Sequence, residues 1–339
     1  MREDGSQLLL LAGNDVIKRF LISGLFIVFA VVLLYQLDIR GSSADPTTVI
    51  YLPAIAEEIS ISDPAVSFAV IGDYGEAGAM EQAVAEMVKS WETDFIITTG
   101  DNNYDNGEAG SIDANVGQYF SETIFPYSGV YTPGTQVNRF FPSLGNHDWN
   151  QGQVQPYLDY FPISESPVNS GNSGNERYYD FVQGPVHFFV LDSDDKEPDG
   201  ATASSKQAAW LEQQLAASTS PWKIVYFHHP PYSSGDHGPT IRMRWLFQEW
   251  GADAVLTGHE HDYERLLVDN FPYFVNGSGG RYLRDFKETA PGSVVRYNAD
   301  HGAMLVRANA GTMVFEFYSI RNWQNPIDRF QLWVDKAAQ

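Results

Sequence analysis

Apolar runs alternate with stretches of helical periodicity along the chain from about residue 65 onwards. Residues 66–71 (VSFAVI) and 95–98 (FIIT) are short, continuous apolar runs, which is the pattern of buried strands. The stretch between them carries apolar residues at helical spacing, namely Met80, Ala83, Val84, Met87, Val88 and Trp91. The order strand, loop, helix, strand predicts a βαβ unit and therefore an α/β fold.

The same order of elements recurs further along the chain. We expect strands at 140–144, 178–191, 222–227, 254–256 and 312–320. Two helices are predicted, one over 204–217 capped by Ser204 or Ser205, and one over 239–250 with Pro239 in its first turn. No Pro- or Ser-rich linker divides the chain after residue 65, so residues 65–339 are predicted to form one catalytic domain.

Residues 20–37 form an uncharged, mostly apolar run of 18 residues near the N-terminus. This length suits a membrane span, and the charges of Arg2, Lys18 and Arg19 favour an N-terminus inside the cell. The small residues at 42–44 (SSA) leave a cleavable signal peptide open. Residues 1–44 are therefore expected to be a cytoplasmic stub with a membrane anchor, or a signal segment. Both alternatives place the body of the protein outside the cytoplasm.

The chain of 339 residues is strongly acidic, with 21 Lys and Arg against 43 Asp and Glu and a formal net charge of −22. Such a surface repels phosphate backbones, so nucleic-acid binding through a basic face is not expected. A small phosphorylated substrate would need local cations to overcome this field. The chain has no cysteine, which excludes zinc–thiolate sites, iron–sulfur clusters and a cysteine nucleophile.

Polar side chains of the kind that bind metals follow five of the predicted strands. In chain order these are Asp73, Asp101 with Tyr104, Asn146 with His147, His228, and His259 with His261. Ligands bind at the carboxyl ends of strands in α/β sheets because several strand ends meet there. The sequence therefore predicts a site for two metal ions. Two cations would neutralise phosphate charge and lower the pKa of a bound water, so that hydroxide attacks phosphorus in line.

The order GDYG, GDNNY, GNHD, FHHPPY with DHGPT, and GHEHDYERL resembles the calcineurin-like metallophosphoesterase superfamily, and within it the small, tartrate-resistant type of purple acid phosphatase. The resemblance covers about residues 66–280. It implies a four-layer α/β/β/α sandwich after the N-terminal segment. Gly75 stands where the superfamily usually has His, and Tyr104 stands where it usually has Asp. Hard anionic oxygen donors of this kind suit a trivalent cation.

The resemblance also implies a role for each ligand. Asp73, Asp101, Tyr104 and His261 would bind the first metal, expected to be Fe(III). Asn146, His228 and His259 would bind a divalent ion, either Zn, Fe or Mn, to which Asp101 would form the bridge.

A proton donor for the leaving group is still needed, and His147 and His237 are the candidates because histidine titrates near neutrality. Asp148 is placed to orient His147. By resemblance, Asp236 and His237 face the substrate together with His147. His229 is expected to have a structural role or to lie behind the ligands, because neighbours along a strand end point in opposite directions.

These features predict a metal-dependent phosphomonoesterase with a small phosphorylated substrate, bound to the membrane through its N-terminal helix. Two alternatives stay open: a phosphodiesterase or nucleotide hydrolase on the same scaffold, and a non-catalytic metal-binding surface protein. Glu260 and Asp262, which flank the His-x-His block, are interpreted as solvated groups or as groups behind the ligands, not as ligands themselves.

Overall fold

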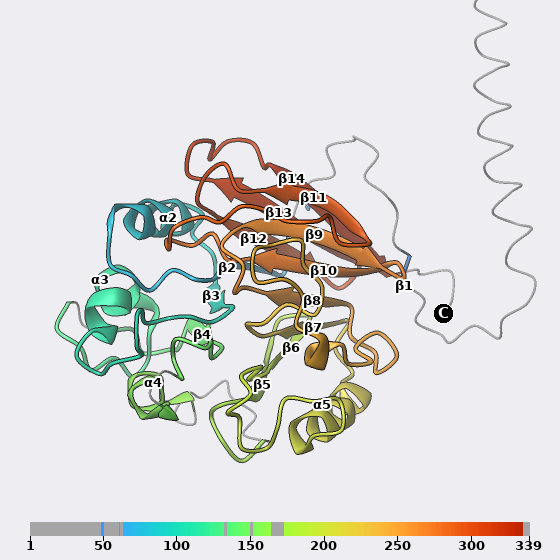
Figure 1. Cartoon of the computed structure of the whole chain (residues 1–339), viewed down its shortest axis with the longest axis horizontal. Helices are drawn as coiled ribbons and strands as arrows, with labels where there is room; N and C mark the ends of the chain where they lie inside the picture. Colours follow the sequence, from blue (N-terminus) through green and yellow to red (C-terminus); the bar gives the residue numbers. More distant parts are fainter. Residues whose placement is uncertain are drawn as a thin grey trace, which may run out of the picture. The chain divides into compact units, whose positions relative to one another are not determined.

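The computed structural model describes residues 49–50, 61, 64–131, 134–149, 152–163 and 173–334 of the chain. They lie in a compact unit, Val49–Asp335 (Figure 1). The predicted N-terminal span, 20–37, lies outside the described residues. Within the described part of the chain, no helix is both long and apolar enough to cross a membrane.

The first of two seven-stranded sheets has the strand order β1-β14-β13-β12-β2-β3-β4. Its strands are β1 (Val49–Ile50), β2 (Val66–Ile71), β3 (Phe95–Thr98), β4 (Phe140–Pro142), β12 (Gly302–Asn309), β13 (Thr312–Ser319) and β14 (Asp328–Val334). Strands β2, β3 and β4 run parallel, with Val70 opposite Ile97 and Ile97 opposite Phe141. The remaining neighbours are antiparallel. β1 precedes residue 65, the predicted start of the domain, and joins the sheet through β14.

The second sheet has the order β11-β9-β10-β8-β7-β6-β5. Its strands are β5 (Tyr179–Gln183), β6 (Val186–Val190), β7 (Trp222–Tyr226), β8 (Ala254–Thr257), β9 (Tyr263–Val268), β10 (Phe271–Asn276) and β11 (Ser293–Tyr297). Strands β6, β7, β8 and β10 are parallel. The strands predicted at 178–191, 222–227, 254–256 and 312–320 are thus confirmed, the first of them as the hairpin β5–β6.

Side chains from both sheets meet in a shared core. Phe68 of β2 lies edge to face against Phe188 of β6, with ring centroids 5.0 Å apart. Phe274 of β10 stacks on Phe315 of β13 at 4.7 Å. The two sheets therefore pack face to face.

Helices cover the outer faces of the two sheets (Figure 1). On the second sheet, Val225 and Val255 pack in one cluster with Leu211 of α5 (Lys206–Ala217). On the first, α2 (Ala79–Ser90) contacts β12 and buries Val84, Met87 and Val88. The predicted mixed α/β fold is confirmed. The smaller helices are η1 (Asp113–Gly117), α3 (Gln118–Phe120), η2 (Ser121–Thr123), α4 (Gln155–Tyr160) and η5 (Ile241–Met243).

Helix α5 matches its prediction, and the Ser205 side chain caps it by accepting a hydrogen bond from the backbone N–H of Ala208 at 3.1 Å. The helix predicted over 239–250 is wrong. Only the 3-10 turn η5 forms, and the chain then runs on without a helix. The physical reason is that burial alternates from one residue to the next: Met243, Trp245 and Phe247 are buried, while the residues between them are exposed. This alternation is that of an extended chain, not of a helix.

Candidate metal centre

The carboxyl ends of strands from both sheets carry the predicted ligands. In the first sheet Asp73 follows β2, Asp101 and Tyr104 follow β3, and Asn146 follows β4; in the second, His228 follows β7, and His259 and His261 follow β8. These strands are parallel within each sheet. Their ends therefore meet at one edge of the sandwich, where the structure brings all seven side chains into one network of contacts.

Three of these residues have a left-handed backbone, with φ of +54° at Asp73, +53° at Asp101 and +70° at His259. Residues other than glycine adopt such angles at a cost of about 1–3 kcal/mol, and they do so most often at functional sites. Here the carboxylates help to hold the loops. Asp73 Oδ2 accepts a hydrogen bond from the His259 N–H at 2.8 Å, and Asp101 Oδ1 accepts one from the His147 N–H at 2.8 Å. Each carboxylate keeps its second oxygen for the site.

The first group of side chains surrounds the phenol of Tyr104. Its hydroxyl lies 3.1 Å from Oδ1 of Asp73, 3.0 Å from Oδ2 of Asp101 and 3.4 Å from Nε2 of His261. The Arg281 guanidinium lies over the Tyr104 ring, 4.5 Å from its centroid. All four members predicted for the first metal, Asp73, Asp101, Tyr104 and His261, are buried.

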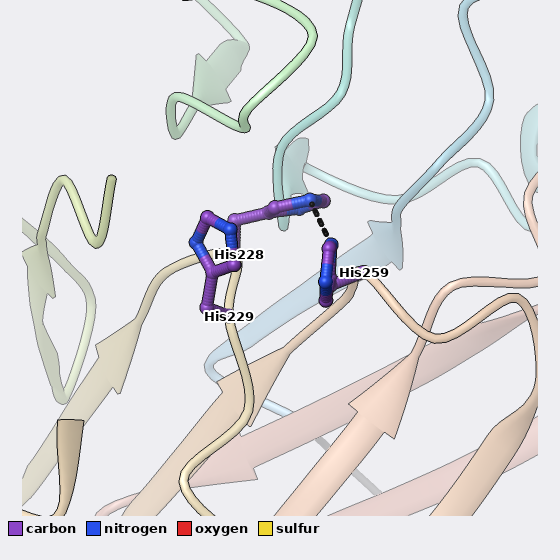
Figure 2. Close-up of side chains that lie close together, drawn as sticks. All are labelled: His228, His229 and His259. Atoms are coloured by element: carbon purple, nitrogen blue, oxygen red, sulfur yellow. Dashed lines mark hydrogen bonds between the residues drawn. The ribbon is translucent and has the colours of Figure 1, made fainter. Parts of the chain in front are cut away.

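The second group surrounds Nε2 of His228. This nitrogen lies 3.1 Å from Oδ1 of Asn146 and 3.2 Å from Nδ1 of His259; Figure 2 shows the latter contact. It also lies 3.3 Å from Oδ2 of Asp101. The same Asp101 oxygen thus faces both groups, which is the position that a bridging carboxylate requires.

The hydrogen bonds of two imidazoles show that the site fits cations. Nδ1 of His228 donates to the carbonyl of Thr99 at 2.8 Å, and Nδ1 of His261 donates to the carbonyl of Tyr282 at 2.8 Å. In the neutral rings each Nε2 therefore carries a lone pair, aimed at other acceptors. Lone pairs that converge on one point repel one another unless a cation lies between them, and anchoring the far nitrogen is how proteins orient metal-binding histidines.

The pKa values of the buried groups also fit a site for cations. Burial opposes the charged form of His228, but Asp101 and Asp73 outweigh it and raise the pKa of His228 to about 10. Burial would raise the pKa of Asp101, yet the charges of His228 and His147 lower it far below its usual range. Burial, with Asp101 and Asp73 beside it, raises the pKa of Tyr104 well above its ordinary value. The protein alone therefore keeps protons on Tyr104 and His228, and a cation has to displace both.

The two candidate proton donors lie at the edge of this network. Nδ1 of His147 donates to the carbonyl of Asp105 at 2.7 Å, and its Nε2 lies 3.9 Å from Oδ2 of Asp101. The ring of His237 lies 4.4 Å from that of His259, and its Nδ1 lies 3.3 Å from Oε2 of Glu260. The His147 and His237 side chains are 31% and 35% exposed, so both are accessible to a substrate.

Asp148 and Asp236 have other partners. The buried Asp148 carboxylate accepts hydrogen bonds from the N–H and side-chain amide of Asn102 and from the N–H of Gly145, and so joins the loops after β3 and β4. Burial and the charge of Asp101 raise its pKa to about 7. Asp236 pairs with Arg284 at 3.0 Å and with Lys287 at 3.1 Å.

Four features of the site were missed or misjudged from the sequence. Glu260 and Asp262 are fully buried, which contradicts the solvated alternative and leaves the other, that they lie behind the ligands. The ring of His229 lies 4.5 Å from that of His259 and 4.9 Å from that of His228, so the two neighbours do not point in opposite directions. The loop that carries Arg281, Arg284 and Lys287 has no hydrophobic pattern that would place it, but contacts such as that between the Arg284 N–H and the His261 carbonyl, at 3.1 Å, bring it to the site.

Two glycines allow the loops to approach one another closely. A Cβ atom at Gly75 would lie 1.9 Å from the backbone oxygen of Asn102, so the histidine that the superfamily usually has there does not fit this chain. A Cβ atom at Gly277 would lie 2.1 Å from the backbone oxygen of Glu260 and 2.6 Å from Oδ2 of Asp73. Residues 276–280 (NGSGG) thus form a tight loop beside the site, which the absence of a side chain on Gly makes possible.

Known proteins resemble this chain in sequence and in structure. Purple acid phosphatase 17 of Arabidopsis thaliana is 29% identical over 246 residues, covering 66% of this chain and 71% of the relative. Human tartrate-resistant acid phosphatase type 5 is 28% identical over 261 residues, covering 68% and 77%. Among solved structures, a purple acid phosphatase from yellow lupin (Lupinus luteus) has a TM-score of 0.64 at 18% identity, covering 81% of this chain and 56% of that one.

A second solved structure has the same fold. GAP50, described as the anchor in the inner membrane complex of Plasmodium, has a TM-score of 0.61 at 18% identity, covering 80% of this chain and 89% of that one.

Two packed mixed sheets, with metal-binding side chains at the carboxyl ends of their parallel strands, define the fold and centre of a metallophosphoesterase. The family model for calcineurin-like phosphoesterases matches residues 66–263. The chain belongs to this family, and its relatives include purple and tartrate-resistant acid phosphatases.

Proposed function

We propose that this protein hydrolyses small phosphomonoesters at a binuclear metal centre of Fe(III) and a divalent ion, either Zn, Fe or Mn. The observation that carries the proposal is the position of Oδ2 of Asp101, 3.0 Å from the Tyr104 hydroxyl and 3.3 Å from Nε2 of His228. One oxygen that faces two groups of ligand atoms is what two adjacent cations need. The acid phosphatases among the relatives support the reaction class.

Seven side chains hold the metals in this proposal. Asp73, Asp101, Tyr104 and His261 hold the ferric ion, since a phenolate and two carboxylates are hard donors. Asn146, His228 and His259 hold the divalent ion, and Asp101 is shared. The ions, when bound, neutralise phosphate charge and lower the pKa of coordinated water. They also offset the repulsion that a chain with net charge −22 exerts on a phosphate.

The proton for the leaving oxygen comes from a histidine at the edge of the centre. We assign this role to His237, with His147 as the second group that contacts the phosphate. Contact with Glu260 at 3.3 Å orients the His237 ring beside His259. Asp148 positions His147 indirectly, through the hydrogen bonds that hold the loop on which His147 lies. Asp236 forms ion pairs with Arg284 and Lys287 and lines the site on the side where the substrate binds.

A phosphodiesterase and a non-catalytic metal-binding protein are the alternatives that an activity assay separates. The full chain, loaded with iron and zinc, is expected to hydrolyse p-nitrophenyl phosphate and to cleave bis(p-nitrophenyl) phosphate much more slowly. Chelation should remove the activity, and Asp101→Asn should not recover it when metals return. Faster cleavage of the diester would favour the phosphodiesterase, and metal uptake without hydrolysis of either ester would favour the binding protein.

We also propose that the protein acts outside the cytoplasm and is held at the membrane by residues 20–37. The support for this lies in the uncharged apolar run and the positive charges before it. Protease digestion of intact cells tests the topology, since only an exported domain is removed.

A further inference from the structure

His229 lies among the ligands of the second metal although it is not one of the seven predicted. Its ring centroid is 4.9 Å from that of His228 and 4.5 Å from that of His259. The three residues offer ligand atoms that lie within 4.8 Å of one another, which is close enough for one metal ion to hold all three. Figure 2 shows the three rings together; His228 and His229 lie on the loop after β7, and His259 lies on the loop after β8.

The backbone explains why two neighbouring residues face the same site. Strand β7 ends at Tyr226, so the alternation of side chains that a strand imposes no longer applies at His228 and His229. Ser193 then fixes the second ring. Its hydroxyl oxygen accepts a hydrogen bond from the N–H of His229 at 2.9 Å and lies 2.9 Å from Nδ1 of the same residue.

This anchor leaves one nitrogen of His229 for the site. With Nδ1 bound to Ser193, the other nitrogen, Nε2, makes no hydrogen bond to any residue that the structure describes. His228 has the same arrangement: its Nδ1 is held by the Thr99 carbonyl and its Nε2 faces the centre. An imidazole anchored at one nitrogen and directed at a cluster of donors with the other is the usual form of a metal-binding histidine.

We propose that His229 supplies a third imidazole to the second metal ion, beside His228 and His259. The proposal rests on the proposed binuclear centre and adds a residue to it. With Asn146 and the shared oxygen of Asp101, the second ion then has three nitrogen donors and two oxygen donors. Imidazole suits zinc, iron, copper and nickel, whereas manganese and magnesium prefer oxygen donors. The second position should therefore select zinc or ferrous iron over manganese and magnesium.

X-ray absorption at the zinc edge of the full chain, loaded with iron first and zinc second, counts the imidazoles at the second position directly. We expect three in the natural protein and two in His229→Ala. Competition with a chelator should show zinc bound more weakly by His229→Ala by at least the roughly 10- to 100-fold that the loss of a hydrogen-bond partner behind a ligand costs. His187→Ala is the matched control, because His187 is held by Asp180 and Ser218 away from the centre. It should bind zinc as the natural protein does.

The number of imidazoles and the zinc affinity decide the inference. Two imidazoles in the natural protein, or unchanged zinc affinity in a folded His229→Ala, would overturn the inference and leave the phosphatase proposal intact. Failure of the natural protein to bind a second metal and to hydrolyse phosphomonoesters would overturn both. If His229→Ala does not fold, the imidazole count in the natural protein still decides. Ser193→Ala, which keeps the ring and removes its anchor, should then weaken zinc binding by a smaller factor than the loss of the imidazole.

Discussion

Oδ2 of Asp101 lies 3.0 Å from the hydroxyl of Tyr104, and both side chains are buried. The three-residue separation within the loop after β3 brings these two oxygens together. A carboxylate next to a phenol keeps the phenol protonated unless a cation takes the proton's place. The protonation of this pair therefore depends on whether a cation is bound.

Replacement of His237 by Ala should separate catalysis from metal binding. The turnover number is expected to fall by about 10²- to 10⁴-fold, which is the usual contribution of a general acid. Metal content should not change, because His237 is not among the ligands. Glu260→Gln, which keeps a group beside the ring at 3.3 Å, should cause a smaller fall. Loss of metal together with activity, or loss of neither, would contradict the assigned role.

Metal uptake should release protons and should strengthen as the pH rises. The pKa of His228 is raised to about 10 and that of Tyr104 lies higher than its ordinary value, so both groups carry protons near neutrality. Each proton displaced makes the apparent affinity about tenfold greater per pH unit. Calorimetry of iron binding and then of zinc binding, in buffers of different protonation enthalpy, measures the release at each step, and Tyr104→Phe should lower the release at the iron step by one proton. Binding without proton release would mean that these groups are not ligands.

Asp253 provides a test of stability far from the metals. Burial raises its pKa to about 7, although the Lys223 N–H donates to its carboxylate at 2.7 Å. The pKa of this carboxyl is 3.8 in the unfolded chain and about 7 in the folded protein. The free energy of unfolding therefore falls as the pH rises from 3.8 to about 7. The loss above that range is of the order of 4 kcal/mol.

Asp253→Asn should therefore be more stable than the natural protein at about pH 8 and equally stable at about pH 4. Urea unfolding at both pH values measures the difference. Equal stability at the higher pH would show that Asp253 is not held in an apolar environment.

A buried ion pair joins the two sheets. The Arg265 guanidinium of β9 donates to both carboxylate oxygens of Asp328 in β14, at 2.6 and 3.0 Å, and the Tyr263 hydroxyl donates to one of them at 2.8 Å. Asp328→Ala leaves the arginine buried without its partner and should cost about 3–5 kcal/mol of unfolding free energy. Glu122→Ala, which breaks the exposed pair with Lys89, should cost about 0–1 kcal/mol. Similar losses for both would contradict this account.

The sequence predicts the seven ligands because each depends on a local feature, a polar block that follows an apolar strand. The parallel order of strands then brings these blocks together, as at Asp73 and Asp101. Features that depend on where an element ends are harder to predict. The side chain of His229 changes direction because β7 stops at Tyr226, and the hydrophobic residues after Pro239 fit a helix until their burial shows a period of two.

Long-range packing accounts for the remaining differences. Glu260 and Asp262 are charged residues in a motif, and nothing local in the sequence shows that the chain around them is buried. Arg281 reaches the ring of Tyr104 from a loop 177 residues away in the sequence, and a contact over that separation has no signature in one sequence.

The visible absorption spectrum of the iron-loaded full chain is the most direct test of the central claim, that Tyr104 binds Fe(III) as a phenolate in a binuclear centre. We expect a purple charge-transfer band in the natural protein. The band should be absent in Tyr104→Phe and should remain in His237→Ala. A metal-loaded, active protein without such a band, or a band that persists in Tyr104→Phe, would contradict the assignment and would point to a centre of two divalent ions with Tyr104 only beside it.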